Sequence, residues 1–326
     1  MSNRPVVAVL GDLNLDVLVQ VETMPPPGGE AHAVTAPAWG GSAALTARWL
    51  AALGCEVRLA AAIGEDPFGD WLWSALTRAG VPTRWIQRVP HLSTGVCLSL
   101  VQRGGERTLL ASPGAARELR WEQIPVSWLE GVDGLHVSGY AWMGAAERGA
   151  AERAVAYARG RGIPVSLDPG AVAPALRPER DLLAGITLAL PNRREIRDLT
   201  GEAEVPRGVM HLRGHGVEWV AVKLDAEGCL VAGPEGEVAV PPFPVVATNA
   251  TGAGDAFNAG AIVGVVLGWP AERLGALANL LGGAAAQRGA AGPLPSLDEL
   301  LSLLDRVPGQ STLGAWLGER WRKGER

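Results

Sequence analysis

The most informative stretch of the chain is Thr248-Asn249-Ala250-Thr251-Gly252-Ala253-Gly254-Asp255-Ala256-Phe257, which joins a strand-like segment to an apolar helix ending near Leu267. Small residues at a helix N-terminus let backbone N–H groups approach an anion closely, and the helix dipole favours negative charge there. Asp255 would stand beside that anion, where a carboxylate can accept a proton from a hydroxyl nucleophile. The same pattern also fits an ordinary helix start, with Asp255 only complementing the dipole.

Outward from this stretch, short apolar runs alternate with longer segments of helical spacing. The strand-like runs are Val6–Leu10, Val57–Ile63, Gly134–Val137, Pro164–Leu167, Thr187–Leu190 and Trp219–Leu224. The helical segments are Ala43–Leu53, Phe68–Ala79, Ala145–Arg161 and Arg194–Thr200, and several of them end at a glycine. This alternation predicts an α/β fold with a mainly parallel central sheet and helices on both faces.

Two regions depart from the alternation. Their strand-like runs, Val17–Val21, Ala31–Thr35, Val96–Gln102 and Arg107–Ala111, are expected to be antiparallel and to form a small β lid outside the main sheet. Near the C-terminus a hairpin is expected over Gly228–Ala232 and Glu237–Val240, followed by helices from Ala253 to about Arg288 and over Leu297–Leu304. We expect one domain over residues 1–305, with lid strands inserted around 17–38 and 94–112. The tail 306–326, with Trp316 and Trp321 as apolar anchors, either docks as a helix or stays mobile.

Composition narrows the class of protein. The chain is 48% hydrophobic and 19% charged, which permits a sizeable core, and its net charge of −5 argues against broad binding to nucleic acid or anionic membranes. Cys55, Cys97 and Cys229 form no C-x-x-C pattern and indicate a reducing compartment. There is no secretion signal and no apolar run long enough to span a membrane, so a cytoplasmic location is expected.

Polar residues follow the first predicted strand. Asn14 and Asp16 are two apart just beyond its C-terminal end, the edge where open α/β sheets place ligands, so both side chains can point the same way and share polyol hydroxyls. Turn formation is the alternative role for them. Gly40 and Gly41 permit close backbone approach to a ligand, or simply form the loop before a helix.

Two further pairs have metal-ligand spacing. Asn192 and Glu195 stand three apart at a helix start, where both can face one ion or its waters, although an ordinary N-cap explains them equally. His211 and His215 are four apart, but glycines interrupt them and no nearby acid completes a ligand set, so we do not expect a metal there.

The stretch Thr251–Asp255 resembles the core of the C-terminal signature of the ribokinase-like carbohydrate kinases, the PfkB family. Four other motifs resemble that family in the same order: Gly11-Asp12-Leu13-Asn14-Leu15-Asp16, Gly40-Gly41-Ser42-Ala43-Ala44, Gly64-Glu65-Asp66-Pro67-Phe68-Gly69 and Asn192-Arg193-Arg194-Glu195. The resemblance covers roughly residues 5–305 and implies a ribokinase-like fold.

The resemblance implies an ATP-dependent phosphotransferase that phosphorylates a hydroxymethyl group of a small sugar or related polyol. It assigns catalysis to Asp255 with the turn Gly252, Ala253 and Gly254, substrate binding to Asn14, Asp16, Gly40 and Gly41, and Mg²⁺ to Glu195. Nucleotide contacts are expected from Asn192, Lys223, Asp225, Gly228 and Asn279. The resemblance also makes a homodimer the expected assembly. Sugar-phosphate kinases of the family resemble a different N-terminal motif, so a free sugar or polyol is the expected acceptor.

Several positions depart from the family pattern. Leu45 stands where an Asn often helps to hold the sugar, and Asn249 replaces an acidic residue, which leaves a monovalent-cation site uncertain. Lys223 and Asp225 alter the phosphate-side loop, and Asp168-Pro169-Gly170 lacks the Asn of a common D-P-N element. Two alternatives therefore stay open: a nucleoside kinase of the same fold, in which Leu45 contacts a base, and a catalytically weakened binding or regulatory protein.

Overall fold

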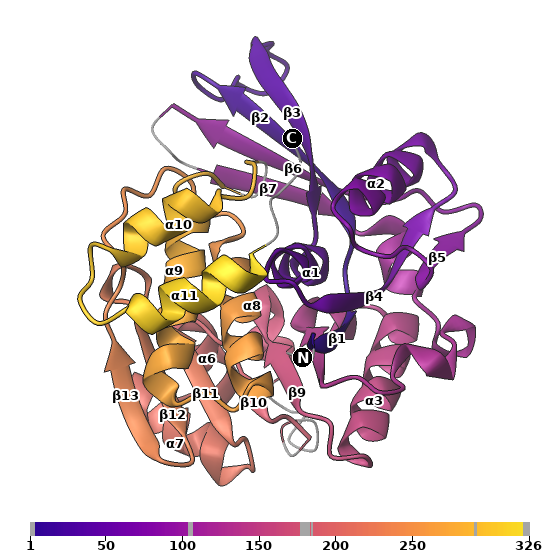
Figure 1. The fold of residues 1–326 in the computed structure, drawn as a ribbon. Coiled ribbons are helices and arrows are strands. Elements are labelled where there is room, and N and C mark those ends of the chain that lie inside the picture. The colour runs from indigo at the N-terminus through magenta and orange to yellow at the C-terminus, as the bar shows by residue number, and fades with distance from the viewer. Residues whose placement is uncertain (1–3, 104–106, 177–182, 184, 290–291, 322–326) are drawn as a thin grey trace.

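A nine-stranded sheet forms the centre of the molecule in the computed structural model, which describes residues 4–103, 107–176, 183, 185–289 and 292–321 (Figure 1). The strand order is β13-β12-β11-β10-β9-β8-β1-β4-β5, parallel from β11 to β5 and antiparallel at β12 and β13. The strands are β1 (Val6–Leu10), β4 (Glu56–Gly64), β5 (Ile86–Val89), β8 (Gly134–Ser138), β9 (Val165–Asp168), β10 (Leu188–Ala189), β11 (Trp219–Lys223), β12 (Cys229–Gly233) and β13 (Gly236–Val240).

Helices cover both faces of this sheet. They are α1 (Ser42–Ala52), α2 (Pro67–Arg78), α3 (Ala145–Arg159), α4 (Ala173–Leu176), α6 (Arg193–Thr200), α7 (Val205–Gly214), α8 (Ala253–Val266), α9 (Ala271–Ala286), α10 (Leu297–Leu304) and α11 (Ser311–Arg320). Short 3₁₀ turns occupy Gly114–Glu118, Trp121–Gln123, Val126–Trp128, Gly139–Trp142, Gly170–Val172 and Asp225–Glu227. The α/β fold expected from the sequence is confirmed.

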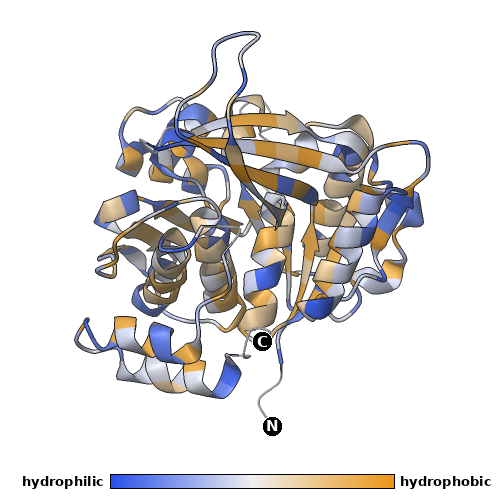
Figure 2. Ribbon diagram, turned by 90° about the horizontal axis from the view of Figure 1, so that it is seen from above, coloured by the Kyte–Doolittle hydropathy of each residue, from blue (hydrophilic) through white to orange (hydrophobic). Residues whose placement is uncertain are grey.

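Two apolar cores lie on opposite faces of the sheet. In β1, Val7 and Val9 belong to the core that α1, α8 and α9 cover, whereas Ala8 and Leu10 belong to the core beneath α3 and α7. Strands buried on both faces need apolar residues at every position, which is why the sequence shows continuous runs rather than alternation. Figure 2 shows these apolar strands inside a more hydrophilic periphery.

The second sheet, here called the lid sheet, consists of β2 (Asn14–Val21), β3 (Ala33–Gly40), β6 (Gly95–Gln102) and β7 (Arg107–Ser112), in the order β3-β2-β6-β7. The expectation that all its strands are antiparallel is wrong, because the central pair β2 and β6 is parallel. Each of these two strands follows a strand of the main sheet, β1 and β5, and those two run in the same direction. Hydrophobic patterning predicts a strand but not the direction of its partner.

Polar contacts anchor the lid sheet to the main domain. Asp66 caps α2 by accepting a hydrogen bond from the Gly69 amide at 2.8 Å, and it also accepts bonds from the Thr94 amide and hydroxyl at 2.7 and 2.6 Å. Thr94 immediately precedes β6. The Gly64–Gly69 motif therefore fixes where the lid strand β6 begins.

The C-terminal tail docks as a helix over its described part. Trp321, after α11, is 7% exposed, and its ring lies 6.1 Å from that of Trp49, while Trp316 packs edge-on against Trp269 at 4.8 Å. Residues 322–326 lie outside the described part. Among the described residues, no helix has the length and apolar character needed to cross a membrane.

Candidate active site

The N-terminus of α8 is open toward a ligand. Gly252 precedes the helix in a left-handed conformation, with φ 79°, and no described side chain caps it. The amide of Ala253, in the turn to which the resemblance assigns catalysis, donates to the Ala250 carbonyl at 3.1 Å. The amides of Gly254 and Asp255 donate to no acceptor in the described part of the chain. The unpaired N–H groups of the first turn are therefore available to bind an anion.

Asp255 lies in that first turn and is held by α1. The Ser42 hydroxyl donates to Asp255 Oδ1 at 2.6 Å, and the Thr46 hydroxyl contacts the main-chain oxygen of Asp255 at 3.5 Å. Burial raises the pKa of the Asp255 carboxyl to about 8, while the hydrogen bond from Ser42 lowers it against that trend. Asp255 therefore titrates near neutral pH, as a general base requires.

The turn at the start of α1 is held by Asp12, which follows β1. The buried Asp12 carboxylate accepts hydrogen bonds from the Ser42 amide at 2.9 Å, the Ala43 amide at 3.3 Å and the Ser138 hydroxyl at 2.9 Å. Gly41 has φ 92°, and a Cβ there would lie 2.4 Å from the Asp12 carbonyl oxygen. Gly41 is thus required for this close approach, and Asp12 caps α1 in place of a local residue.

Asn14 and Asp16 face glycines of the neighbouring lid strands. The Asn14 Oδ1 atom is buried and has no partner among the described residues. A Cβ at Gly95 would lie 2.1 Å from that atom, and a Cβ at Gly40 would lie 1.9 Å from Asp16 Oδ1. The glycines therefore make room for two polar side chains on one face of β2, as their spacing predicted.

A buried ion pair lies beside the open helix end. Lys223 Nζ donates to Asp168 Oδ2 at 2.8 Å and to Asn258 Oδ1 at 3.2 Å, and Asn258 Nδ2 donates to Asp168 Oδ2 at 2.6 Å. Burial alone would lower the pKa of Lys223, but the Asp168 and Glu195 carboxylates hold it above its ordinary value. A Cβ at Gly254 would lie 3.5 Å from Lys223 Nζ. The ammonium group is thus next to the first turn of α8.

Asn192 and Glu195 form a complete capping box at the start of α6. Asn192 Oδ1 accepts from the amides of Arg194 and Glu195 at 2.9 and 2.8 Å, and Glu195 Oε2 accepts from the Asn192 amide at 2.8 Å. Burial, with repulsion from Asp168, raises the pKa of Glu195 to about 7. Asn192 therefore acts as the N-cap of α6, one of the two roles considered for this motif. The capping box lies next to Lys223, whose backbone forms an isolated parallel β-bridge with that of Asn192.

The remaining predicted nucleotide residues lie around the end of β13. Asn279 Nδ2 donates to the carbonyl oxygens of Val240 and Pro241, both at 3.0 Å. Gly228 has φ 88°, and a Cβ there would lie 2.2 Å from the Val240 oxygen. Asp225 also has a positive φ of 53°. Gly228 and Asn279 therefore hold the chain as it leaves β13 toward the open helix end.

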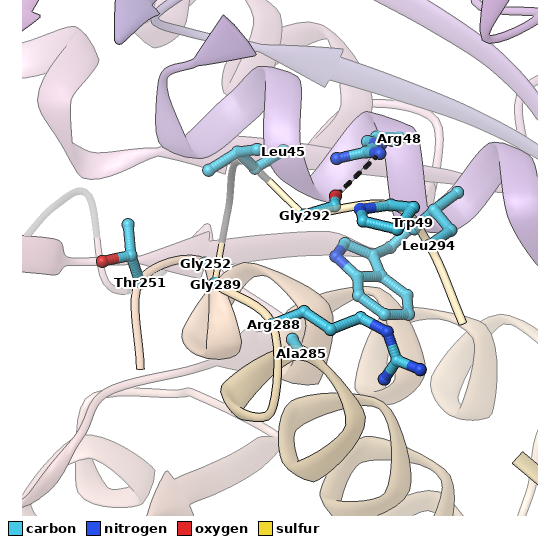
Figure 3. Close-up of a pocket in the computed structure, with 11 residues that line it drawn as sticks. Leu45, Arg48, Trp49, Thr251, Gly252, Ala285, Arg288, Gly289, Gly292 and Leu294 are labelled. Atoms are coloured by element: carbon cyan, nitrogen blue, oxygen red, sulfur yellow. Dashed lines mark hydrogen bonds between the residues drawn. The ribbon is translucent and has the colours of Figure 1, made fainter. Parts of the chain in front are cut away.

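The departures at Leu45 and Asn249 lie on the α9 side of that helix end. Leu45 is 5% exposed and lines a hollow of about 10 Å³ with Thr251, Gly252 and Gly289 (Figure 3). Asn249 Oδ1 accepts from the Thr251 amide at 2.9 Å and so supports the turn before α8.

His211 and His215 stack on each other, with ring centroids 4.5 Å apart. Within the described ranges no three His, Cys, Asp or Glu residues cluster as metal ligands.

Sequence analysis missed Ser42 and Asn258, which both contact predicted site residues. Ser42 stood inside a quoted motif, but nothing in the sequence links it to a residue in α8. Asn258 had a local signal: it is a polar residue three positions after Asp255 in an otherwise apolar helix. That spacing places it on the same side of α8 as Asp255.

The sequence matches the pfkB family of carbohydrate kinases over residues 5–297. The chain belongs to this family. It is therefore a PfkB carbohydrate kinase, a phosphotransferase with an alcohol group as acceptor.

Relatives and solved structures agree with this membership. An ATP-dependent ribose-1-phosphate kinase from Halopiger xanaduensis is 30% identical over 90% of this kinase and 96% of its own length. The crystal structure of a ribokinase from Thermotoga maritima superimposes with a TM-score of 0.80 at 26% identity, covering 92% of this chain and 99% of that one. A putative ribokinase II from E. coli, in complex with ATP and Mg²⁺, has the same fold, with a TM-score of 0.82 at 23% identity over 93% and 99% of the two chains.

Proposed function

We propose that this PfkB kinase transfers the γ-phosphoryl group of ATP to a hydroxymethyl group of a small sugar or related polyol. The observation that carries the proposal is the pairing of Asp255, whose carboxyl pKa is raised to about 8, with the open amides of Gly254 and Asp255 itself. A base and an anion site within the same first turn of a helix suit phosphoryl transfer to an alcohol.

In the proposed acceptor site, Asn14 and Asp16 hold hydroxyl groups of the substrate. The unpartnered Asn14 Oδ1 is an acceptor that a substrate hydroxyl satisfies, and burial of such an atom without a partner is costly. Gly40 and Gly41 give the Asp16 carboxylate and the Asp12 carbonyl the space that they occupy beside this site. These contacts fix the reacting hydroxyl near Asp255, which gives the rate advantage of orientation.

The proposed reaction is a direct transfer. Asp255 accepts the proton as the acceptor oxygen attacks the γ-phosphorus, and the bond to the bridging oxygen breaks, so that ADP leaves with the electron pair. The amides of Gly254 and Asp255, at the positive end of α8, stabilise the charge on the transferring group. Lys223 adds a positive charge next to them.

Glu195 and Asp168 are the carboxylates that would hold a hydrated Mg²⁺ ion here. Repulsion between their carboxylates contributes to the raised pKa of Glu195, and a divalent cation relieves such repulsion. When bound, Mg²⁺ supplies positive charge to the phosphate oxygens. Asn192, Asp225, Gly228 and Asn279 shape the nucleotide side of the same site.

The same proposal extends to assembly as a homodimer through the lid sheet. Val34 in the edge strand β3 is 70% exposed, and Leu109 and Leu110 in the opposite edge strand β7 are 49% and 54% exposed. Apolar side chains on edge strands favour association with a second copy. A mass measurement by light scattering distinguishes a dimer from a monomer.

The deciding experiment measures ADP release from MgATP over ribose, deoxyribose, fructose, sugar acids, nucleosides and, because of the Halopiger relative, ribose-1-phosphate. Asp255→Asn is the matched control. We expect turnover with one class of free sugar or polyol, and its loss in the control. Turnover confined to nucleosides would instead favour a nucleoside kinase, although Leu45, only 5% exposed, offers little surface to a base. ATP binding without turnover on any acceptor would indicate a binding or regulatory protein.

A further inference from the structure

The two carboxylate oxygens of Asp255 have different surroundings. Oδ1 accepts the short hydrogen bond from the Ser42 hydroxyl, at 2.6 Å. No described residue donates a hydrogen bond to Oδ2. A carboxylate that is bound on one side keeps the other oxygen for a further partner.

Ser42 is itself held in place. It is the first residue of α1, and its amide donates to the buried Asp12 carboxylate at 2.9 Å. The left-handed Gly41 before it, with φ 92°, fixes the direction in which the helix begins. The hydroxyl of Ser42 is therefore presented to α8 by a turn that is anchored by Asp12, just after β1.

We propose that Ser42 is a positioning residue for the catalytic base: its hydroxyl holds Asp255 Oδ1 and thereby turns Oδ2 toward the acceptor hydroxyl. This inference rests on the proposed function, in which Asp255 is the base. The proton of the acceptor passes to Oδ2 as the acceptor oxygen bonds to the γ-phosphorus of ATP and the bond to ADP breaks. Ser42 keeps its own proton throughout.

The charges around Asp255 make this hydrogen bond important. Asp12 after β1, Asp168 at the end of β9 and burial all disfavour the ionised carboxylate, whereas Lys223 in β11 and Ser42 in α1 favour it. Tyr140, in the 3₁₀ turn after β8, is uncharged near neutral pH because burial raises its pKa to about 12. Ser42 is thus the hydrogen-bond donor that favours the ionised form of Asp255 against burial and the neighbouring carboxylates.

The test is the pH dependence of kcat, measured by ADP release with MgATP and whichever acceptor of the panel turns over fastest. Ser42→Ala removes the donor, so we expect the acid limb of the profile to move up by about one pH unit, and turnover at pH 7 to fall about tenfold. Ser42→Thr keeps a hydroxyl and should keep the wild-type profile. Thr46→Val is the matched control, because its hydroxyl contacts the main-chain oxygen of Asp255 and not the carboxylate. An acid limb that stays in place in Ser42→Ala would overturn the proposal.

A second readout needs no acceptor. Because the folded-state pKa of Asp255 is raised to about 8, the protonated carboxyl favours the folded state, and this stability is lost as pH rises toward 8. The Tm of the wild type minus that of Asp255→Asn should therefore fall up to about pH 8 and then level off. The same difference on the Ser42→Ala background should keep falling for about one further pH unit. Full activity of Asp255→Asn would refute the base itself, whereas identical Tm curves on both backgrounds would refute only the role of Ser42.

Discussion

Helices α6 and α8 both begin beside Lys223, but the N-terminal amides of α6 are capped and those of α8 are open. The N-terminus of α6 is closed by the side chains of Asn192 and Glu195, which satisfy each other's backbone amides at 2.8 Å. The N-terminus of α8 begins at Gly252, has no side-chain cap in the described part of the chain, and leaves two amides without a protein acceptor. Both carry an acidic residue at the third helical position, Glu195 and Asp255.

An acidic residue at the third helical position can therefore close a helix end, as Glu195 does, or leave the helix end available to a ligand, as Asp255 does. Capping satisfies the amides of α6, so its N–H groups are not available to an anion. Gly252 cannot cap, so α8 keeps its amides and its dipole for a ligand. Its acidic residue is consequently not tied to its own backbone and is bound by Ser42 on another helix.

The largest effect should come from removing the acid at the open helix end. We expect Asp255→Asn to lower kcat about a thousandfold or more while leaving the KM for ATP within a fewfold, because asparagine retains the shape but cannot accept the proton. Steady-state ADP release and a thermal melt are the measurements. Near-normal turnover in a folded variant would remove Asp255 from the base role.

An intermediate effect should come from removing the Lys223 ammonium group, which lies beside the N-termini of α6 and α8. Lys223→Met should lower kcat/KM for ATP about a hundredfold, because it removes the positive charge beside the Gly254 amide. It also leaves the buried Asp168 carboxylate unpaired, so the Tm should drop as well. The double variant Lys223→Met/Asp168→Asn should recover Tm but not ATP use. If ATP use also returned, Lys223 would serve only to neutralise Asp168.

The smallest effect should come from substituting Glu195 at the capped N-terminus of α6. Glu195→Gln keeps the capping box, since glutamine can accept the same amide bond, so Tm should change little. Half-saturation by Mg²⁺ should rise about tenfold. With the Glu195 pKa raised to about 7, Mg²⁺ affinity of the wild type should fall as pH drops below 7, and this dependence should vanish in the variant.

The matched control for that variant is Glu299→Gln. Glu299 closes the same capping box with Ser296 at the start of α10, away from the candidate site. It should leave the Mg²⁺ response unaltered. An equal response of the two variants to Mg²⁺ would show that Glu195 only caps α6.

Sequence alone predicted the parts of this molecule that depend on local patterning. The apolar runs around Val57–Ile63 and Trp219–Leu224 correspond to β4 and β11, because parallel strands are buried on both faces. Asn14 and Asp16 share a face because residues two apart in a strand must do so. The turn Gly252–Gly254 begins a helix as its small residues indicated.

What sequence could not supply depends on contacts between distant segments. Nothing near Ser42 indicates that its hydroxyl meets Asp255, and the direction of β6 relative to β2 is set by the main-sheet strands that precede them. The short strand β5 (Ile86–Val89) and helix α7 (Val205–Gly214) were not predicted, since short or weakly patterned elements are fixed by packing.

The parallel pairing of β2 with β6 has a consequence for how acceptor preference can change. Asn14 pairs with Gly95, so the central register of the lid sheet joins two separate excursions of the chain from the main domain. A shift of one residue in β2 would turn Asn14 away from the proposed acceptor site, and a shift of one residue in β6 would bring a side chain to the position that Gly95 keeps clear. The residues of the central strands β2 and β6 must therefore change together. Residues of the edge strands β3 and β7, apart from Gly40, can be substituted independently. A change of acceptor is therefore most readily achieved by substitutions in the edge strands of the lid sheet, before any in its central strands.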